Sequence, residues 1–241
     1  MLGHLERERR IQQYISGLKQ IAAVVDGYPC FDVFSMDNTV EHAGTMDSRL
    51  TAALDNIPRL KGKYHFLDNE TGKINKGSGL VLQWSRTLPD LLGSYEYVVH
   101  YEPRQDLVDF SFFQRMASHP DAYVCEYRDK QRLYGIPLTL PRFWTGFFSM
   151  KTSDLLNYAR AGDRGVSTSI QYYRTWRLSR ILRRRLLPGW AAELKECIES
   201  DFPRYVKRHN IPVIRIPALG SRWHQEANNK WVDMVDRDFD D

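Results

Sequence analysis

Hydrophobic and polar residues follow two different periods along this chain, and each period predicts a kind of secondary structure. Between residues 5 and 25, apolar side chains recur every three or four positions, which places them on one face of a helix. Residues 31–36 alternate between apolar and polar, and residues 95–101 are rich in valine and tyrosine; both patterns favour strands. Further helices are predicted near residues 48–57, 80–88, 106–117, 152–160 and 191–198, and further strands near 63–67, 122–127, 143–148 and 211–217.

Strands and helices that alternate in this way predict an α/β fold in which helices flank a mainly parallel sheet. In such sheets, ligands bind outside the carboxyl ends of the strands. Three polar segments fall at that edge, namely Asp37–Asn38, Asn75–Gly79 and His100–Gln105. Because a parallel arrangement brings strand ends together, we expect these segments to form one site.

Composition and charge narrow the class of protein. The chain has 241 residues, of which 42% are hydrophobic, which suits one packed domain with a short appendage. The net charge of +4 is too small to predict non-specific binding to nucleic acid. The three cysteines lie far apart without a C-x-x-C spacing, so neither a disulfide framework nor a zinc site is expected. The charged first ten residues and the lack of a long apolar run predict a cytoplasmic protein, at most peripheral to a membrane.

The segment Asn75-Lys76-Gly77-Ser78-Gly79 has the character of a phosphate-binding loop. Its glycines allow the backbone to approach a ligand closely, and the helix that follows points its positive end at the loop. Lys76 adds a mobile cation. The loop lacks the G-K-S/T ending of the Walker motif, which argues against an ATPase. A plain connection between a strand and a helix also fits this segment.

Glu102 follows an apolar strand and precedes Pro103, a position that folding needs alone explain poorly. Two interpretations remain open. Glu102 binds a metal together with His100, or Glu102 forms an ion pair with Arg104 while Arg104 neutralises a diphosphate without metal. A single histidine such as His100 is more often a packed core residue than a ligand.

The order of these motifs resembles that of nucleotide-sugar glycosyltransferases with the GT-A fold. The resemblance covers about residues 28–175 and includes the strand followed by Asp-Asn, the NKGSG loop, the strand ending in HYEPRQ, and the stretch FWTGFFSMKTSDLLNY. It implies a Rossmann-like, mainly parallel sheet and transfer of a sugar from a nucleotide donor to a glycan or glycolipid acceptor. Synthesis of a polysaccharide or lipopolysaccharide is the implied context. Such folds normally open with a strand, whereas this chain begins with a charged helix, so we expect the first strand of the family to be absent, replaced or lost in an upstream segment.

The resemblance also assigns roles to individual residues. The family places an Asp-x-Asp motif, which holds Mn or Mg against the diphosphate, where this chain reads His100-Tyr101-Glu102. The implied metal ligands are therefore His100, Glu102 and His224. The implied donor-binding residues are Asp37, Asn38, Asn75, Lys76, Gly77 and Arg104; the implied acceptor-binding residues are Trp144, Thr145 and Gly146; and the implied catalytic residues are Asp163, as general base, and Glu102. Structural alternatives fit as well: a helix cap or turn for Asp37 and Asp163, and a hydrophobic core for the aromatic residues around Trp144.

Residues 174–190 form a basic amphipathic segment with six arginines and no acidic residue. Such a helix suits contact with an anionic membrane surface near a lipid-linked acceptor, an ordinary packed helix, or nucleic acid. The alternative function is therefore a non-catalytic module that binds anionic lipid or nucleic acid through Arg174–Arg185. For the transferase, no nucleic-acid partner is expected. A nucleotidyltransferase of similar sheet topology is a third and weaker option.

The expected organisation is one domain over residues 1–220. Its donor half covers about residues 1–105, its acceptor half about 106–175, and its basic helical region 174–200. Residues 221–241 are expected to form an acidic C-terminal tail.

Overall fold

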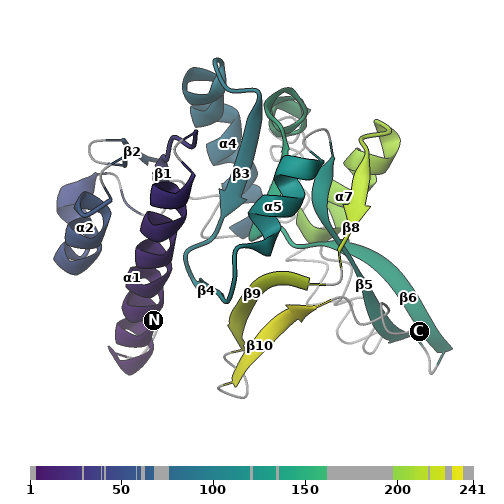
Figure 1. Ribbon diagram of the computed structural model, residues 1–241, viewed down its shortest axis with the longest axis horizontal. Helices are drawn as coiled ribbons and strands as arrows, with labels where there is room; N and C mark the ends of the chain where they lie inside the picture. The colour runs from purple at the N-terminus through teal and green to yellow at the C-terminus, as the bar shows by residue number, and fades with distance from the viewer. Residues whose placement is uncertain are drawn as a thin grey trace, which may run out of the picture.

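The computed structural model describes residues 4–28, 30–38, 40, 42–57, 59–60, 63–67, 76–119, 122–133, 136–161, 198–216, 218–225 and 230–235. These residues form a mixed α/β structure with small sheets (Figure 1). The helices are α1 (His4–Gly27), η1 (Ala43–Thr45), α2 (Ser48–Asp55), α4 (Lys76–Leu92), α5 (Ser111–Ser118), a helix over residues 152–161, and α7 (Ile198–Arg208). The strands are β1 (Ser35–Asp37), β2 (Tyr64–Phe66), β3 (Tyr97–Tyr101), β4 (Gln105–Leu107), β5 (Tyr123–Leu133), β6 (Ile136–Phe143), β7 (Phe147–Lys151), β8 (Val213–Arg215), β9 (Ala218–Gln225) and β10 (Lys230–Val235).

The strands pair in four small sheets. Their orders are β1-β2, β3-β7, β6-β5-β8 and β10-β9-β4. Only β1 with β2 and β5 with β8 run parallel; the other described pairs are antiparallel. The predicted α/β class is confirmed, whereas the prediction of a mainly parallel sheet is wrong for the described strands. One reason is the β5–β6 hairpin, because the two strands of a hairpin run antiparallel. Its second strand, β6, contains Pro137 and Pro141 and lies at a sheet edge, where proline is tolerated.

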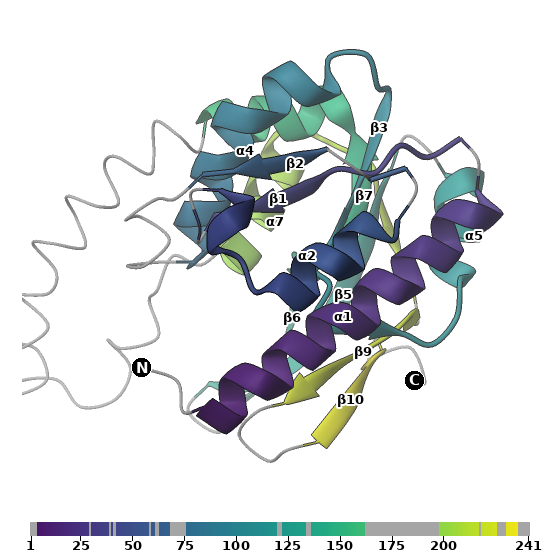
Figure 2. The same cartoon turned by 90° about the vertical axis from the view of Figure 1, so that its left-hand side faces the viewer.

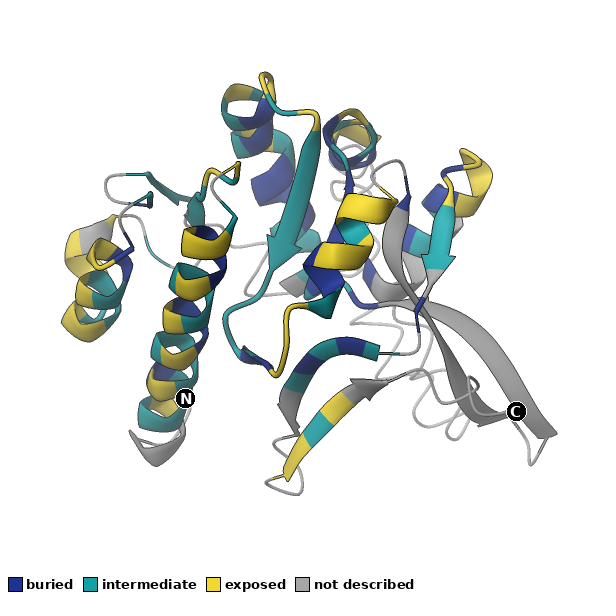
Figure 3. Ribbon diagram, viewed as in Figure 1, coloured by how far each residue is buried: buried dark blue, intermediate teal, exposed yellow. Residues whose placement is uncertain are grey.

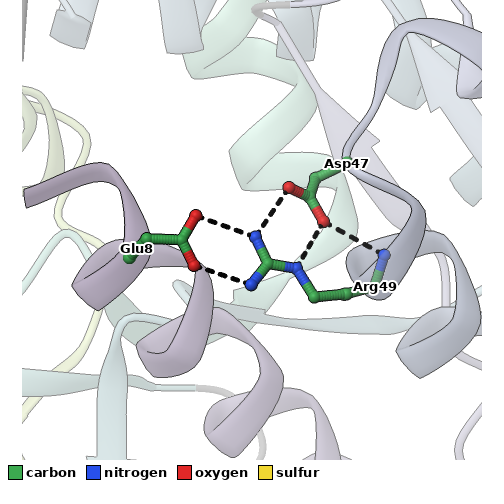
Figure 4. A network of polar contacts seen from close by, with 3 residues as sticks. All are labelled: Glu8, Asp47 and Arg49. Atoms are coloured by element: carbon green, nitrogen blue, oxygen red, sulfur yellow. Dashed lines mark hydrogen bonds and ion pairs between the residues drawn. The ribbon is translucent and has the colours of Figure 1, made fainter. Parts of the chain in front are cut away.

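The long first helix is confirmed, and α2 packs beside it (Figure 2). Leu18 of α1 joins Leu54, Ile57 and Leu60 in a small buried cluster. At the surface above this cluster, Arg49 forms two hydrogen bonds to Glu8 of α1, at 2.7 and 3.0 Å (Figure 4). The same guanidinium binds Asp47, and its hydrogen bonds lower the pKa of Asp47 to about 2.

Because Arg49 is exposed, the Arg49→Ala substitution should change stability little. Solvent screens exposed ion pairs, so we expect the melting temperature to fall by no more than about 1 °C in low salt. In high salt the difference should vanish. Thermal unfolding of both proteins at two salt concentrations measures this, and a large fall that persists in high salt would show that the network holds α2 in place.

The main hydrophobic core encloses β3 and β7 between helices. On one face, Trp84 of α4 and Phe202 of α7 contact Phe148, with ring centroids 5.8 and 5.4 Å away. On the other face, Phe112 of α5 packs 4.0 Å from Phe147. In Figure 3 the outer side of α5 is exposed and the buried positions of α4 lie toward β3. The β3–β7 pair is therefore covered on both sides, which leaves its ends as places for a site.

The helix α4 extends further than its sequence pattern predicts. Pro89, at which the predicted helix ends, lies inside α4, which continues to Leu92. A proline near the end of a helix removes one backbone hydrogen bond, and the buried side chains of Leu88 and Leu92 offset this loss. Only four residues then separate α4 from β3, so the N-terminal end of α4 lies toward the carboxyl end of β3.

The segment after residue 220 takes part in a sheet. The predicted boundary between the domain and its C-terminal tail, at residue 220, falls inside β9. This strand pairs with β4 on one side and β10 on the other. Arg222 of β9 binds Asp106 of β4 through its Nε at 2.8 Å, and its guanidinium lies 5.2 Å from the Trp231 ring. Gln20 of α1 also binds Asp106 and accepts a 2.8 Å hydrogen bond from the Leu107 backbone. These contacts join α1 to the β4–β9–β10 sheet.

Candidate functional site

Two turns meet at the carboxyl end of β3. The first, residues 102–104, follows β3 and is called the Glu102 turn here. The second is the Gly146 turn, Thr145–Gly146, which precedes β7. The Glu102 backbone N–H donates to the Gly146 carbonyl at 2.7 Å. The antiparallel pairing of β3 with β7, which ends at Tyr101 and Phe147, places the two turns side by side.

Glu102 and Arg104 form an ion pair within the first turn. The Arg104 Nε donates to Glu102 Oε1 at 2.6 Å, and a second guanidinium nitrogen contacts the same oxygen. Both side chains are about one-third exposed, at 37% for Glu102 and 30% for Arg104. The ion pair of the second interpretation is therefore present, and its charges remain within reach of a ligand.

The Gly146 turn leaves space for side chains of the neighbouring turn. A Cβ atom added at Gly146 would lie 2.1 Å from the Gln105 Nε2 and 3.3 Å from the Glu102 Oε2. Any other residue at position 146 would displace the Gln105 amide. The absence of a side chain at Gly146 thus serves the packing of Gln105 and Glu102.

Helix α1 closes one side of this site. A Cβ at Gly17 would lie 2.0 Å from the Pro103 carbonyl oxygen, so α1 rests directly on the Glu102 turn. Tyr14 lies on the same helix face, three residues earlier. Desolvation raises the pKa of its hydroxyl, the charge of Arg104 opposes this rise, and the charges of Glu102 and Asp37 add to it. Tyr14 therefore stays protonated near neutral pH and can act as a hydrogen-bond donor.

Asp37 ends β1 and belongs to the same electrostatic neighbourhood, because its charge acts on the Tyr14 hydroxyl. Its Oδ1 accepts a 3.2 Å hydrogen bond from the Val40 backbone, and its carbonyl accepts one of 2.9 Å from Leu67. This hydrogen bond fits the alternative interpretation of Asp37 as a turn residue. Asn38 follows directly and is half-buried. Two of the three predicted polar segments, at Asp37 and Glu102, come together around Tyr14.

His100 is a packed histidine rather than an open ligand. Its ring lies 5.3 Å from the Trp84 ring and 5.2 Å from the Phe148 ring. Desolvation lowers its pKa to about 4, although the nearby Glu102 charge works in the opposite direction. The imidazole is therefore neutral at physiological pH and directed at the aromatic core.

The predicted acceptor residue Trp144 also belongs to the core. Its side chain is only 7% exposed and lies in the main hydrophobic cluster. A sugar ring cannot stack on a face that other side chains cover, so the prediction of a stacking surface is wrong. Its neighbour Thr145 is half-buried in the Gly146 turn and remains close to Glu102.

The start of α4 differs from an open phosphate loop at Gly77. A Cβ there would lie 3.1 Å from the Ile198 Cβ, so Gly77 allows α7 to pack closely. Lys76 begins α4, but its side chain lies outside the described part of the structure. Asn75 also lies outside the described residues, as do Asp163 and the basic segment 174–190.

His224 lies in β9, one position beyond the pairing of Trp223 with Gln105. Its backbone thus lies toward the Glu102 turn, while its side chain is not among those described. Within the described part of the chain, no three or more His, Cys, Asp or Glu side chains are grouped to hold a metal ion. The described residues do not fit the predicted metal site, because the His100 ring packs against Trp84 and Phe148, and Arg104 binds Glu102.

Three residues at this site, Tyr14, Gly17 and Gln105, were not among the site residues predicted from the sequence. Tyr14 and Gly17 lie within a regular helical pattern that carries no chemical motif. Gln105 ends the HYEPRQ segment, so its place directly after Glu102 and Arg104 could have marked it as a site residue.

In comparisons with known proteins, no family model, curated protein or solved structure matches this chain.

Proposed function

We propose that this chain is a glycosyltransferase of the GT-A type that takes a sugar from a nucleotide donor and transfers it to a glycan or lipid-linked acceptor. The observation that carries the proposal is the meeting of the Glu102 and Gly146 turns beside Asp37 and Tyr14. This combines a cation, carboxylates and a hydroxyl donor at the end of a strand. Synthesis of a surface polysaccharide or lipopolysaccharide, on the cytoplasmic side of a membrane, is the context we propose.

In this proposal Arg104 neutralises the donor diphosphate, and Glu102 orients the guanidinium through their ion pair. Tyr14 donates a hydrogen bond to a phosphate oxygen, and Asp37 accepts one from a ribose or base group. A carboxylate removes the proton of the acceptor hydroxyl as its oxygen attacks the anomeric carbon, and the nucleotide leaves with the bonding electrons. Asp163 remains our candidate for that base.

None of the helices among the described residues is long and apolar enough to cross a bilayer. Contact with a membrane surface would instead use the basic segment 174–190, which lies outside those residues. The same segment carries the alternative function, binding of anionic lipid or nucleic acid, and no described contact favours it.

A ligand panel tests the proposed function. Thermal unfolding is measured with UDP-, GDP-, CMP- and dTDP-sugars, each with and without Mn²⁺. A ligand that binds only the folded state raises the melting temperature, and one nucleotide should do so at micromolar to millimolar concentration. A shift that requires Mn²⁺ would restore a metal to the proposal. If no nucleotide sugar shifts the melting temperature, the transferase proposal fails, and steeply salt-dependent binding to lipid vesicles or nucleic acid would support the alternative.

Arg104→Gln should weaken binding of the active nucleotide sugar about thirtyfold, because a charge-assisted hydrogen bond to phosphate is lost. Arg86→Gln, at an exposed position on α4, is the matched control and should bind as the wild type does. The dissociation constants follow from melting curves at several ligand concentrations. Equal affinity of the Arg104 variant and the control would contradict the assignment of Arg104 to the diphosphate.

A further inference from the structure

Trp231 differs from Trp144 in its exposure to solvent. It lies in β10, which is an edge strand of the β10-β9-β4 sheet, and 42% of it is exposed. Trp144, by comparison, is 7% exposed. An exposed indole keeps much of its apolar surface in water, and tryptophan is enriched at surfaces where a ligand or a partner binds. Trp231 is therefore able to take the stacking role that the buried Trp144 cannot.

Charged side chains share the face of the sheet on which Trp231 lies. Arg222 of β9 is directly opposite Asp106 of β4 and Asp233 of β10, and residues opposite each other point to the same face. Trp231 is two positions from Asp233, so it points to that face as well. The Arg222 guanidinium lies over the indole, 5.2 Å from the ring centroid. These four residues form one surface, which is called the Trp231 face here.

Arg222 is held in place and is nevertheless open to solvent. Its Nε and Nη2 contact the Asp106 Oδ2 at 2.8 and 2.7 Å, and Gln20 of α1 also binds that carboxylate. The Arg222 side chain is 43% exposed, whereas that of Asp106 is 16% exposed. A guanidinium that the fold already fixes loses little conformational entropy when a ligand binds to it. The Trp231 face therefore offers a prearranged donor beside an exposed ring.

The charges of the Trp231 face favour an uncharged ligand. One cation, Arg222, stands beside two carboxylates, Asp106 and Asp233, and Asp233 is exposed. Nucleic acid and anionic lipid bind to surfaces with an excess of positive charge, which these three side chains do not provide. A sugar ring fits better, because its C–H groups stack on the electron-rich face of an indole. Its hydroxyl groups can both accept hydrogen bonds from a guanidinium and donate them to a carboxylate.

We propose that the Trp231 face binds a ring of an uncharged glycan, which stacks on Trp231 and forms hydrogen bonds with Arg222 and Asp233. This inference rests on the proposed function and deepens it, because it identifies the acceptor as an uncharged glycan and gives it a binding surface. That surface adjoins the candidate site. Asp106, which holds Arg222, directly follows Gln105, and Gln20 belongs to the helix that rests on the Glu102 turn.

The test is a titration with uncharged trisaccharides of glucose, galactose, mannose and N-acetylglucosamine, up to about 10 mM and followed by ligand-observed NMR. At least one should bind, and Trp231→Ala should lose about tenfold in affinity for it. Trp231→Phe keeps a ring for stacking and should restore most of the affinity. The matched control is Phe110→Ala, because Phe110 is a similarly exposed aromatic residue, at 40%, before α5; this variant should bind as the wild type does.

Several results would overturn the glycan site: no trisaccharide binds the wild type, Trp231→Ala binds as tightly as the wild type, or Trp231→Ala weakens the binding of poly(U) or of phosphatidylglycerol vesicles instead. Arg222→Gln provides a second variant and should also weaken glycan binding, by about fivefold. The nucleotide-sugar panel on the wild type separates the two proposals. Glycan binding without nucleotide binding means that the transferase proposal fails and the glycan site stands. Nucleotide binding without glycan binding overturns the glycan site alone.

Discussion

Gly17→Ala should lower the free energy of unfolding by about 3 kcal/mol, although alanine is the better helix former. The added Cβ would lie 2.0 Å from the Pro103 carbonyl oxygen and 2.8 Å from its carbonyl carbon, and both are backbone atoms that cannot rotate away. Either α1 or the Glu102 turn must move. Overpacking of this kind costs about 1–3 kcal/mol, and loss of the Gln20 hydrogen bonds to Asp106 and Leu107 adds to it. The gain in helix propensity returns only about 1 kcal/mol.

The same displacement should weaken ligand binding, because it moves Tyr14 away from Arg104 and Glu102. Gly27→Ala is the matched control on the same helix, since a Cβ at Gly27 meets nothing within 4 Å. Urea unfolding of the two variants measures the difference directly. If the Gly17→Ala and Gly27→Ala variants are both as stable as the wild type, α1 does not rest on the Glu102 turn. Helix α1 would then not close one side of the site.

Acid should destabilise the protein through His100. The unfolded chain binds a proton at this side chain near the ordinary pKa of 6.5, whereas the folded protein binds it only near 4. Between these two values the unfolded state carries more protons, so stability falls as the pH falls. The contribution of His100 is fully present above pH 6.5, and about 3 kcal/mol of it is lost by pH 4. Below pH 4 this group causes no further loss.

His100→Phe should remove that part of the pH dependence, because a phenyl ring fits between the Trp84 and Phe148 rings and does not titrate. His119→Gln, at an exposed position after α5, should leave the pH dependence as it is in the wild type. Free energies of unfolding at pH 7 and pH 4 for the three proteins provide the measurement. A His100→Phe protein that loses as much stability in acid as the wild type would show that the imidazole is not desolvated.

Local features of the site could be predicted from the sequence. The valine- and tyrosine-rich pattern predicted β3, and the polar residues after it placed Glu102 and Arg104 at the carboxyl end of that strand. Their ion pair was one of the two interpretations of this segment. It could be predicted because two opposite charges that are two residues apart in a turn can contact each other. The helical period predicted α1 almost to its ends.

Other features could not be predicted because they depend on which surfaces meet. An aromatic residue before a turn, such as Trp144, can stack on a sugar ring or pack in the hydrophobic core. Only the residues that surround it in the fold decide between these two roles. A strand pattern is the same in parallel and antiparallel pairs, so the direction of β7 against β3 was not accessible. The proline-containing strand β6 was also missed, since only its place at a sheet edge makes the prolines acceptable.

The sequence by itself determined the α/β class, the main helices and the acidic and basic residues that end β3, because each follows from local periodicity and turn chemistry. The tertiary structure decided how these parts combine. It placed Gly17 on Pro103, Gln105 beside Gly146 and His100 between two aromatic rings. The physical reason is that contact between distant segments depends on shape and desolvation at their interface, and neither is encoded in the spacing of residues along one segment.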